Sequence, residues 1–238
     1  MARKRGFAIT SDVLMPRKDY DRLFDLSMEF KEPYFLQTPY TDPGAVFSTI
    51  RLRNSNSTWM VKAFSAERFN HGLGIDIFPL DYWHFSGEEK YEAEMAGIIF
   101  DNSTYMRRNQ SFKDHETFSR VTDYLRRKGE TSALHDFERL QDLARKYRDS
   151  PTDCLAVLCI TAYPYVKQKF NSSAFESLVN VNFEGFQIPA PSGYDHVLSQ
   201  LYNDYLKLPP LESRGTWHSK LIINPDVPYV RFLDVKSD

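Results

Sequence analysis

Cysteine is scarce in this sequence of 238 residues, which contains only Cys154 and Cys159. The two thiols lie five positions apart inside an apolar run, a spacing that does not match the C-x-x-C of zinc knuckles and redox sites. No His-rich segment follows that could complete a metal site. We therefore expect both to be buried structural thiols, which suits a reducing compartment.

Long hydrophobic runs are also missing. The longest apolar stretch, Cys154 to Tyr163, has about half the length that a membrane-spanning helix needs. The first residues, Met1 to Arg5, are followed by no apolar segment of signal-peptide type. The sequence predicts a cytoplasmic protein without a transmembrane segment, and it leaves peripheral contact with a membrane open.

The chain has no excess of charge of either sign. Its formal net charge is −2, and the short basic clusters Arg3–Arg5 and Arg126–Lys128 are flanked by acidic or ordinary sequence. Such clusters are most simply solvated surface. Because a nucleic-acid-binding protein normally has a basic face, this charge balance argues against that class of function.

Several catalytic motifs are absent. Gly72-x-Gly74 is too short for a dinucleotide-binding fingerprint, and the chain contains no P-loop. The G-x-S-x-G elbow of Ser/His/Asp hydrolases is missing as well. These absences argue against the common nucleotide-loop and serine-hydrolase mechanisms.

What the sequence does contain is a globular composition, 42% hydrophobic and 26% charged, which suits a single domain over residues 1–238. The expected elements are a helix from Pro16 to about Phe30, strands between Tyr34 and Met60, a strand at Gly74–Phe78 stopped by Pro79, a helical insertion over about 86–150, a strand around Val179–Phe186 and a helix from Tyr194 to about Tyr205. Cys154–Ile160 could be a buried helix or a buried strand. This order predicts an α/β or α+β domain with helices packed on a mixed sheet.

The segment from His71 to Asp81 carries the most informative pattern. On a strand, Ile75 and Ile77 face one side and Asp76 faces the other. A carboxylate in that setting is either hydrogen-bonded or coordinates a metal, since burying it without a partner is costly. Both interpretations stay open from the residues alone. Asp81, beyond the expected end of the strand, is expected to cap a turn.

A second acidic strand candidate begins at Asp12. Carboxylates on two neighbouring strands can hold a divalent metal for phosphoryl transfer, so Asp12 and Asp76 form a candidate pair. Arg51 and Arg53 lie on the polar face of their strand, where a guanidinium could bind a phosphate. For Arg53 we prefer the alternative of solvent exposure or pairing with helix acids.

Three blocks of this sequence resemble the LicD family. They are Met15-Pro16-Arg17-Lys18-Asp19-Tyr20, the run His71–Asp81, and a tail with Tyr194-Asp195, Leu198, Leu201-Tyr202-Asn203-Asp204-Tyr205, Leu208-Pro209-Pro210, Arg214 and His218. The blocks occur in the family's order and span most of the chain. The resemblance implies a nucleotidyltransferase-like fold. It also implies transfer of phosphocholine or a related phospho-alcohol from a CDP-activated donor such as CDP-choline to a cell-surface glycan or teichoic acid.

The same resemblance implies roles for particular residues. Asp12 and Asp76 match the family's catalytic carboxylates, which hold Mg²⁺ or Mn²⁺. The implied substrate-binding residues are Arg51 as a phosphate contact, His71 as the residue that orients the Asp76 loop or the donor, and Tyr202, Asp204, Arg214 and His218 on the acceptor side.

The chain also departs from the family pattern, which has a G-T-L-L-G turn followed by R-H-K-G-F-I-P-W-D-D-D-I-D. Ala2–Phe7 resembles the R-H-K-G-F part, and the next stretch, Ala8–Asp12, is shortened. Thr10 or Ser11 stands where the first metal-binding Asp should be, and the glycine turn has no counterpart, as in an N-terminally truncated relative. Fewer anionic ligands and lost phosphate positioning predict weak or absent transferase activity. The alternative is a non-catalytic remnant or binding protein of the same family.

Overall fold

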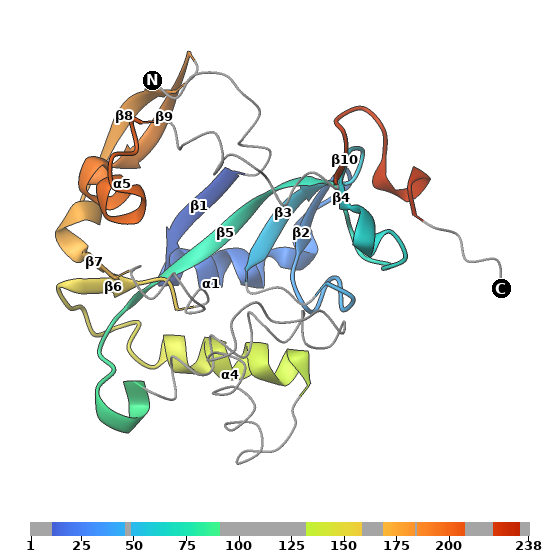
Figure 1. The fold of residues 1–238 in the computed structure, drawn as a ribbon. Coiled ribbons are helices and arrows are strands. Elements are labelled where there is room, and N and C mark those ends of the chain that lie inside the picture. The colour runs from blue at the N-terminus through green and yellow to red at the C-terminus, as the bar shows by residue number, and fades with distance from the viewer. Residues whose placement is uncertain are drawn as a thin grey trace.

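The computed structural model describes residues 11–45, 49–90, 132–158, 169–183, 185–207 and 221–233. It is an α+β structure whose main sheet is mixed (Figure 1). The elements are, in chain order, β1 (Ser11–Pro16), α1 (Arg17–Asp25), η1 (Ser27–Glu29), β2 (Tyr34–Gln37), β3 (Ile50–Asn54), β4 (Thr58–Val61), η2 (Lys62–Phe64), β5 (Leu73–Tyr82), α4 (Ala133–Arg145), β6 (Cys154–Ala156), β7 (Lys169–Asn171), η4 (Ser172–Phe175), β8 (Leu178–Phe183), β9 (Phe186–Pro191), α5 (Tyr194–Tyr202), β10 (Leu221–Asn224) and η7 (Tyr229–Arg231). The expected α+β class is thereby confirmed.

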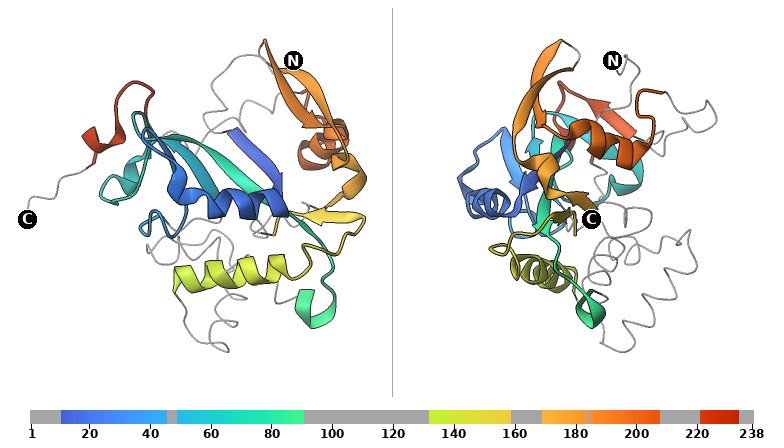
Figure 2. Two further views of the ribbon diagram at one scale, coloured as in Figure 1. Left: turned by 180° about the vertical axis from the view of Figure 1, so that it is seen from behind. Right: turned by 90° about the vertical axis from the view of Figure 1, so that its left-hand side faces the viewer.

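The six-stranded sheet is organised around β5. Its strand order is β2-β3-β5-β6-β7, and β1 pairs with β5 in parallel while the other pairs are antiparallel. Two smaller sheets are formed by β4 with β10 and by β8 with β9. In the right-hand view of Figure 2, α1 lies on one side of β1 and β5, and α5 lies on the other. The two faces of β5 are therefore covered by different helices, α1 on one side and α5 on the other.

Strand β5 is longer than predicted. We expected it to stop at Pro79, but it continues to Tyr82, and Pro79 pairs with Met15 in the parallel register. The antiparallel partner β3 reaches only as far as Ile77. Proline is tolerated in a strand where its missing N–H is not needed by a neighbouring ladder. The predicted end at Pro79 was wrong because it took account of the proline alone and not of the neighbouring strands that pair with β5.

Helix α1 covers one face of the sheet. It is shorter than the predicted Pro16–Phe30 helix, because it ends at Asp25 and a 3₁₀ turn follows. Tyr20 is fully buried in a cluster with Leu36, Ile50 and Ile77. The cluster joins α1 to β2, β3 and β5, and its burial against apolar neighbours is the main local source of stability.

Asp81 is not the turn cap that we expected. It lies within β5 at 1% exposure and binds the guanidinium of Arg17, which donates from Nε to Oδ1 at 2.5 Å and from Nη2 to Oδ2 at 2.9 Å. Arg17 also donates from Nη1 to Oε1 of Gln141 at 2.7 Å. Burial lowers the pKa of Arg17, but the charge of Asp81, its hydrogen bonds with Arg17 and the smaller contributions of Tyr20 and Asp21 together outweigh burial and raise that pKa. This contact ties α1 and β5 to α4.

Other expectations are met in part. The undecided segment after Cys154 contains a strand, β6, and Cys154 is half-buried rather than fully buried, with a thiol pKa raised by desolvation. Cys159 lies outside the described residues. The expected strand around Val179–Phe186 is instead a hairpin of two strands. Its turn contains Gly185 at φ +90°, a backbone conformation that favours glycine.

The helical insertion expected over about 86–150 is seen only at its ends. Helix α4 lies in it, and residues 91–131 fall outside the described part of the chain. Helix α5 ends at Tyr202, three residues before the predicted end. Within the described residues, no helix combines the length and the hydrophobicity needed to cross a bilayer.

The Arg17–Asp81 contact predicts a large stability effect. Asp81→Asn should lower the free energy of unfolding by about 3–5 kcal/mol, because it leaves the buried guanidinium of Arg17 with only the longer, 3.5 Å contact to Asp21 as a counter-charge. Urea denaturation followed by circular dichroism measures this. The control is Asp149→Asn, which removes an exposed pair with Lys18 at 3.0 Å and should cost less than about 1 kcal/mol. Similar losses in the two variants would contradict the prediction.

Candidate functional site

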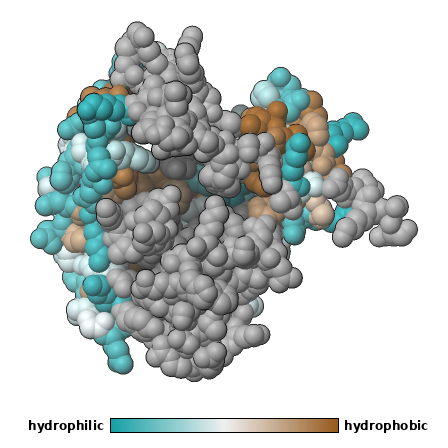
Figure 3. All heavy atoms as spheres, in the orientation of Figure 1, coloured by the Kyte–Doolittle hydropathy of each residue, from teal (hydrophilic) through white to brown (hydrophobic). Residues whose placement is uncertain are grey.

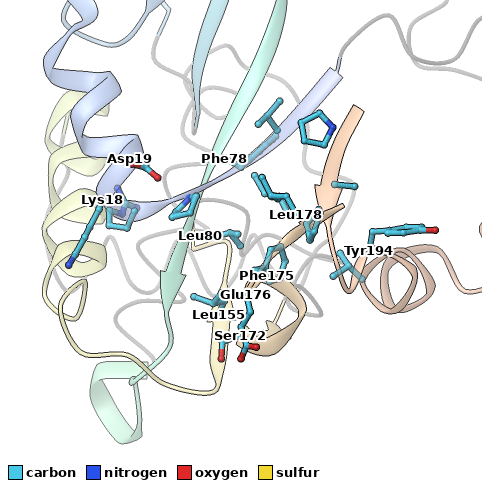
Figure 4. Close-up of a pocket in the computed structure, with 18 of the residues that line it drawn as sticks. Lys18, Asp19, Phe78, Leu80, Leu155, Ser172, Phe175, Glu176, Leu178 and Tyr194 are labelled. Atoms are coloured by element: carbon cyan, nitrogen blue, oxygen red, sulfur yellow. The ribbon is translucent and has the colours of Figure 1, made fainter. Parts of the chain in front are cut away.

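A large cleft of about 1480 Å³ opens beside β1 and β5 and reaches the first residues of α1. One wall is formed by β1 and β5, and the other by η4, β8, β9 and α5 (Figure 4). A cleft with an apolar wall and a few polar groups is the usual form of a small-molecule site. Several of the residues predicted from the sequence lie along its walls, among them Asp76, Arg51 and Tyr202.

Alternation along β5 decides which residues reach the cleft. Asp76, Phe78, Leu80 and Tyr82 all line it, at every second position of the strand. Ile77, between them, is buried in the α1-facing cluster. This confirms the expectation that Asp76 and Ile77 face opposite sides of the sheet.

The backbone register aligns three candidate residues across neighbouring strands. Asp12 of β1 pairs with Asp76 of β5, and Arg51 of β3 pairs with Asp76 from the other side. Neighbouring strands lie about 4.8 Å apart. Asp12 is described here by its backbone position alone, and the residues that follow it in β1, Val13, Leu14 and Pro16, line the cleft. The predicted pair of aspartates is thus at matching positions of adjacent strands.

Arg51 and Asp76 form an ion pair. Nε of Arg51 lies 2.8 Å from Oδ1 of Asp76, and both side chains are 18% exposed. Both also line the cleft, together with the indole of Trp59 from β4. The residue that we expected to contact phosphate therefore holds the carboxylate that we expected to hold a metal.

Arg53 has a different environment from the one that we preferred. It is 3% exposed rather than solvated, donates from Nε to Oε1 of Gln37 at 3.0 Å and from Nη1 to the carbonyl oxygen of Gly72 at 2.7 Å. Burial, and then the charge of Arg51, lowers the pKa of its guanidinium. Arg53 therefore links β3 to β2 through Gln37 and to the loop before β5 through Gly72.

Two glycines of the His71–Asp81 run are explained by close packing. A Cβ at Gly74 would lie 2.8 Å from Cδ of Arg53, and one at Gly72 would lie 2.2 Å from the carbonyl oxygen of Asn54. A larger residue would push β3 away from β5 at Gly74, and away from the loop before β5 at Gly72. The sequence analysis considered these glycines only as a failed nucleotide motif, and their position opposite an arginine strand was the signal that it missed.

His71 lies in the packed loop before β5. Its side chain is 2% exposed, its ring centroid lies 3.9 Å from that of Phe69, and its Nε2 lies 3.0 Å from the carbonyl oxygen of Glu67. It is not among the residues that line the cleft. These contacts give His71 a role in packing this loop, and the structure does not bring its ring to the Arg51–Asp76 pair.

The four candidate residues of the C-terminal tail differ in their position relative to the cleft. Tyr202 of α5 lines the cleft and is largely exposed. Asp204 lies beyond the end of α5, forms an ion pair with Lys207 at 2.8 Å and is not part of the cleft wall. Arg214 and His218 fall outside the described residues. Only Tyr202 is therefore placed beside the candidate site.

Some cleft residues were not foreseen as site residues. At the start of α1, Lys18 and Asp19 line the cleft, and Lys18 pairs with Asp149 at the opposite rim. The apolar part of the wall is formed by Phe78, Leu80, Leu155, Phe175 and Leu178, whose side chains converge in Figure 4. The apolar wall could not be read from the motifs, because its members come from elements far apart in the sequence.

The capacity of the site for a metal is limited. Across the described residues, no group of three or more His, Cys, Asp or Glu side chains is placed to hold a metal ion. The candidate ligands are thus the two positions Asp12 and Asp76. Magnesium is commonly bound through one or two carboxylates together with the phosphates of a substrate, so a pair is compatible with Mg²⁺ that binds with its substrate.

Comparison with known proteins gives no match: no family model matches the chain, and neither the curated proteins nor the solved structures contain a match. The LicD resemblance carried by the three sequence blocks therefore stays a prediction.

Proposed function

We propose that this protein is a LicD-like transferase with a nucleotidyltransferase-like fold. In this proposal it moves phosphocholine or a related phospho-alcohol from a CDP-activated donor to a cell-surface glycan or teichoic acid. The observation that carries the proposal is the row of Asp12, Asp76 and Arg51 at matching positions of three neighbouring strands beside a large cleft. Two carboxylates next to an arginine suit a ligand that contains both a divalent cation and phosphate groups.

Asp12 and Asp76 are the residues that would hold Mg²⁺ or Mn²⁺. A bound divalent ion supplies positive charge that offsets the charge developing on the transferred phosphate. The carboxylate of Asp76 has to be available for this, and in the structure it is held by Arg51 at 2.8 Å. The proposal therefore needs a ligand that takes Arg51 away from Asp76.

The diphosphate of a CDP-activated donor can do so. A guanidinium binds phosphate oxygens through two parallel hydrogen bonds, which are charge-assisted and stronger than neutral ones. Arg51 is only partly exposed, so its contacts are weakly screened by solvent. When Arg51 binds the donor, Asp76 loses its counter-charge and becomes an anionic ligand. Donor and metal would then bind cooperatively.

The transfer itself is a displacement at phosphorus. An oxygen of an acceptor hydroxyl forms a bond to the phosphorus of the phospho-alcohol, the bond from that phosphorus to the CMP oxygen breaks, and CMP leaves with the electron pair. The hydroxyl proton passes to solvent water. Because such reactions depend on positioning and electrostatic stabilisation, the contribution of the chain is to hold the diphosphate at Arg51 and the acceptor along the cleft. Tyr202 is the one acceptor-side candidate on the cleft wall.

A second candidate function is binding of the same donor or glycan without catalysis. It is favoured by the ion pair that neutralises Asp76 and by the lack of a third metal-ligating side chain in the described part of the chain. A site with few anionic ligands binds a hard cation weakly. Donor binding without turnover would distinguish this candidate from the transferase.

Calorimetric titration of CDP-choline into the full chain tests donor binding. We expect magnesium to increase the affinity for CDP-choline by about tenfold or more. Asp76→Asn should remove this increase, because one of the two carboxylates is lost. Asp226→Asn, which removes an exposed carboxylate near β10, is the control and should behave as the wild type. No heat at millimolar CDP-choline would contradict the binding of this donor, which the transferase requires, and would leave only glycan binding of the second candidate function.

Arg51→Met should have two effects of opposite sign. Donor affinity should fall by about ten- to a hundredfold, the equivalent of a charge-assisted hydrogen bond. Affinity for Mn²⁺ without donor should rise, because Asp76 is released from its ion pair. Calorimetry measures the first and electron paramagnetic resonance of free Mn²⁺ the second. Lys207→Met, in an exposed pair away from the cleft, is the control. If metal affinity does not rise, Arg51 does not restrain Asp76.

A further inference from the structure

The two outer edges of the β8–β9 hairpin differ in their capacity to pair with a further strand. At the base of the hairpin, Ser192 donates from its backbone N–H to the carbonyl oxygen of Ser177 at 2.8 Å, so this pair is hydrogen-bonded. Hydrogen-bonded and non-hydrogen-bonded pairs alternate along an antiparallel ladder. The pair of Asn180 with Pro189, three steps along, is therefore non-hydrogen-bonded, and its backbone groups point outward from the hairpin.

Prolines close the outer edge of β9 and leave that of β8 open. Pro189 and Pro191 stand at positions whose backbone points outward, and neither has an N–H to donate. On β8 the outward positions are Leu178, Asn180 and Asn182, and the strand contains neither proline nor a charged residue. Among the described residues, β8 pairs with β9 alone. Because proteins protect free edges with proline, charge or cover, β8 is the edge at which we expect a partner strand.

The hairpin also presents an apolar face. It stands beside α5 in Figure 1, and Figure 3 shows hydrophobic surface, in brown, over this part of the molecule. One face carries only apolar side chains, those of Val179, Val181, Phe183, Phe186, Ile188 and Ala190. Four of them are at least 38% exposed, and the face borders the cleft at Val181 and Ile188. Two strands alone are marginally stable in water, whereas a larger sheet with an apolar face is stable.

The sequence of β8 is self-complementary about Val181. If two β8 strands pair antiparallel with Val181 opposite itself, Val179 of one copy lies opposite Phe183 of the other, and Asn180 lies opposite Asn182. Directly opposite residues share a face, so the apolar pairs extend the apolar face and the amide pairs lie on the other. In the same register the outward backbone groups of Asn180 and Asn182 meet, which allows about four hydrogen bonds between the copies.

We propose that the outer edge of β8 is a dimerisation surface, and that its partner is β8 of a second copy of this chain, antiparallel and centred on Val181. The product is a four-stranded sheet in the order β9-β8-β8-β9. Such a two-fold contact uses the same surface of both copies and closes on itself. Glu184, the only charged residue from 178 to 191, lies between the strands in the sequence, and antiparallel pairing places these two connections at opposite ends of the joint sheet. The inference does not rest on the proposed function.

A second copy suits this edge better than an unrelated strand. A foreign strand would have to alternate apolar and amide residues in the same phase, whereas β8 supplies both halves of that pattern by itself. The contact is small, since β8 has 6 residues and a standard interface has roughly 20–30 on each side. We therefore expect a reversible dimer that forms at micromolar concentration rather than a permanent one.

Sedimentation velocity of the full chain at about 1–200 μM tests the dimer, and the wild type should pass from monomer to dimer over this range. Asn180→Pro removes an outward N–H from β8 in both copies, so the dissociation constant should rise by about tenfold or more. Gln187→Pro is the matched control. It removes an outward N–H from the β9 edge, opposite Asn182, and should dimerise as the wild type does.

Charge exchange at Val181 tests the register. Val181→Lys and Val181→Glu each place like charges directly opposite each other at the axis, so either variant alone should dimerise about fivefold or more weakly. An equimolar mixture of the two should recover the dimer, because opposite charges then face each other. The recovery also shows that each variant is folded.

Each outcome decides the inference. A wild type that stays monomeric over the whole range overturns it, and the partner of this edge is then a strand of another protein. Equal dimerisation by Asn180→Pro and Gln187→Pro places the interface elsewhere and also overturns it. A mixture of the two Val181 variants that recovers no dimer rules out the axis at this residue. Because both prolines replace exposed residues of the same hairpin, their melting temperatures should be alike, which circular dichroism checks.

Discussion

The buried ion pair between Arg17 and Asp81 determines how the first strand lies against the sheet. Arg17 directly follows Pro16, the last residue of β1, and its guanidinium is held by Asp81 of β5. With this contact in place Pro16 lies opposite Leu80, and the parallel register continues back to Asp12 opposite Asp76. A slip of one residue would place Ser11 or Val13, in place of Asp12, opposite Asp76. A salt bridge on one face of the sheet thus sets the site on the other face.

The two arginines of β3, Arg51 and Arg53, lie on the same face of the strand but have different contacts. Arg53 is buried and donates to the amide oxygen of Gln37 and to the backbone carbonyl of Gly72. Both acceptors are uncharged, so they do not neutralise its positive charge. Arg51 sits at the cleft wall and neutralises Asp76. Together they place two cationic groups next to the paired aspartate positions. Such a mixture of charges attracts a ligand that carries both phosphate and a metal, and it disfavours a free cation.

The sequence alone predicted the α+β class and the opposite orientations of Asp76 and Ile77, because the period of two is a local property of a strand. It failed where distant partners decide. Asp81 looked like a cap because its partner, Arg17, lies 64 positions away, and Arg53 looked exposed because the space beneath it is created by Gly74. For His71 we expected a role in orienting the Asp76 loop or the donor, and its contacts with the ring of Phe69 and the carbonyl of Glu67 place it in the loop before β5. Pairing and packing, rather than residue type, made these differences.

The cleft joins two kinds of chemistry on a single rigid element. Strand β5 carries Asp76, Phe78 and Leu80 on one face, so the distance between the charged and apolar parts is fixed by the pleat and cannot adjust to the ligand. Leu80 is only 4% exposed and belongs to the buried core cluster, and Phe78 packs against that cluster. The packing of these apolar positions therefore holds the strand in place, and with it the position from which Asp76 meets Arg51.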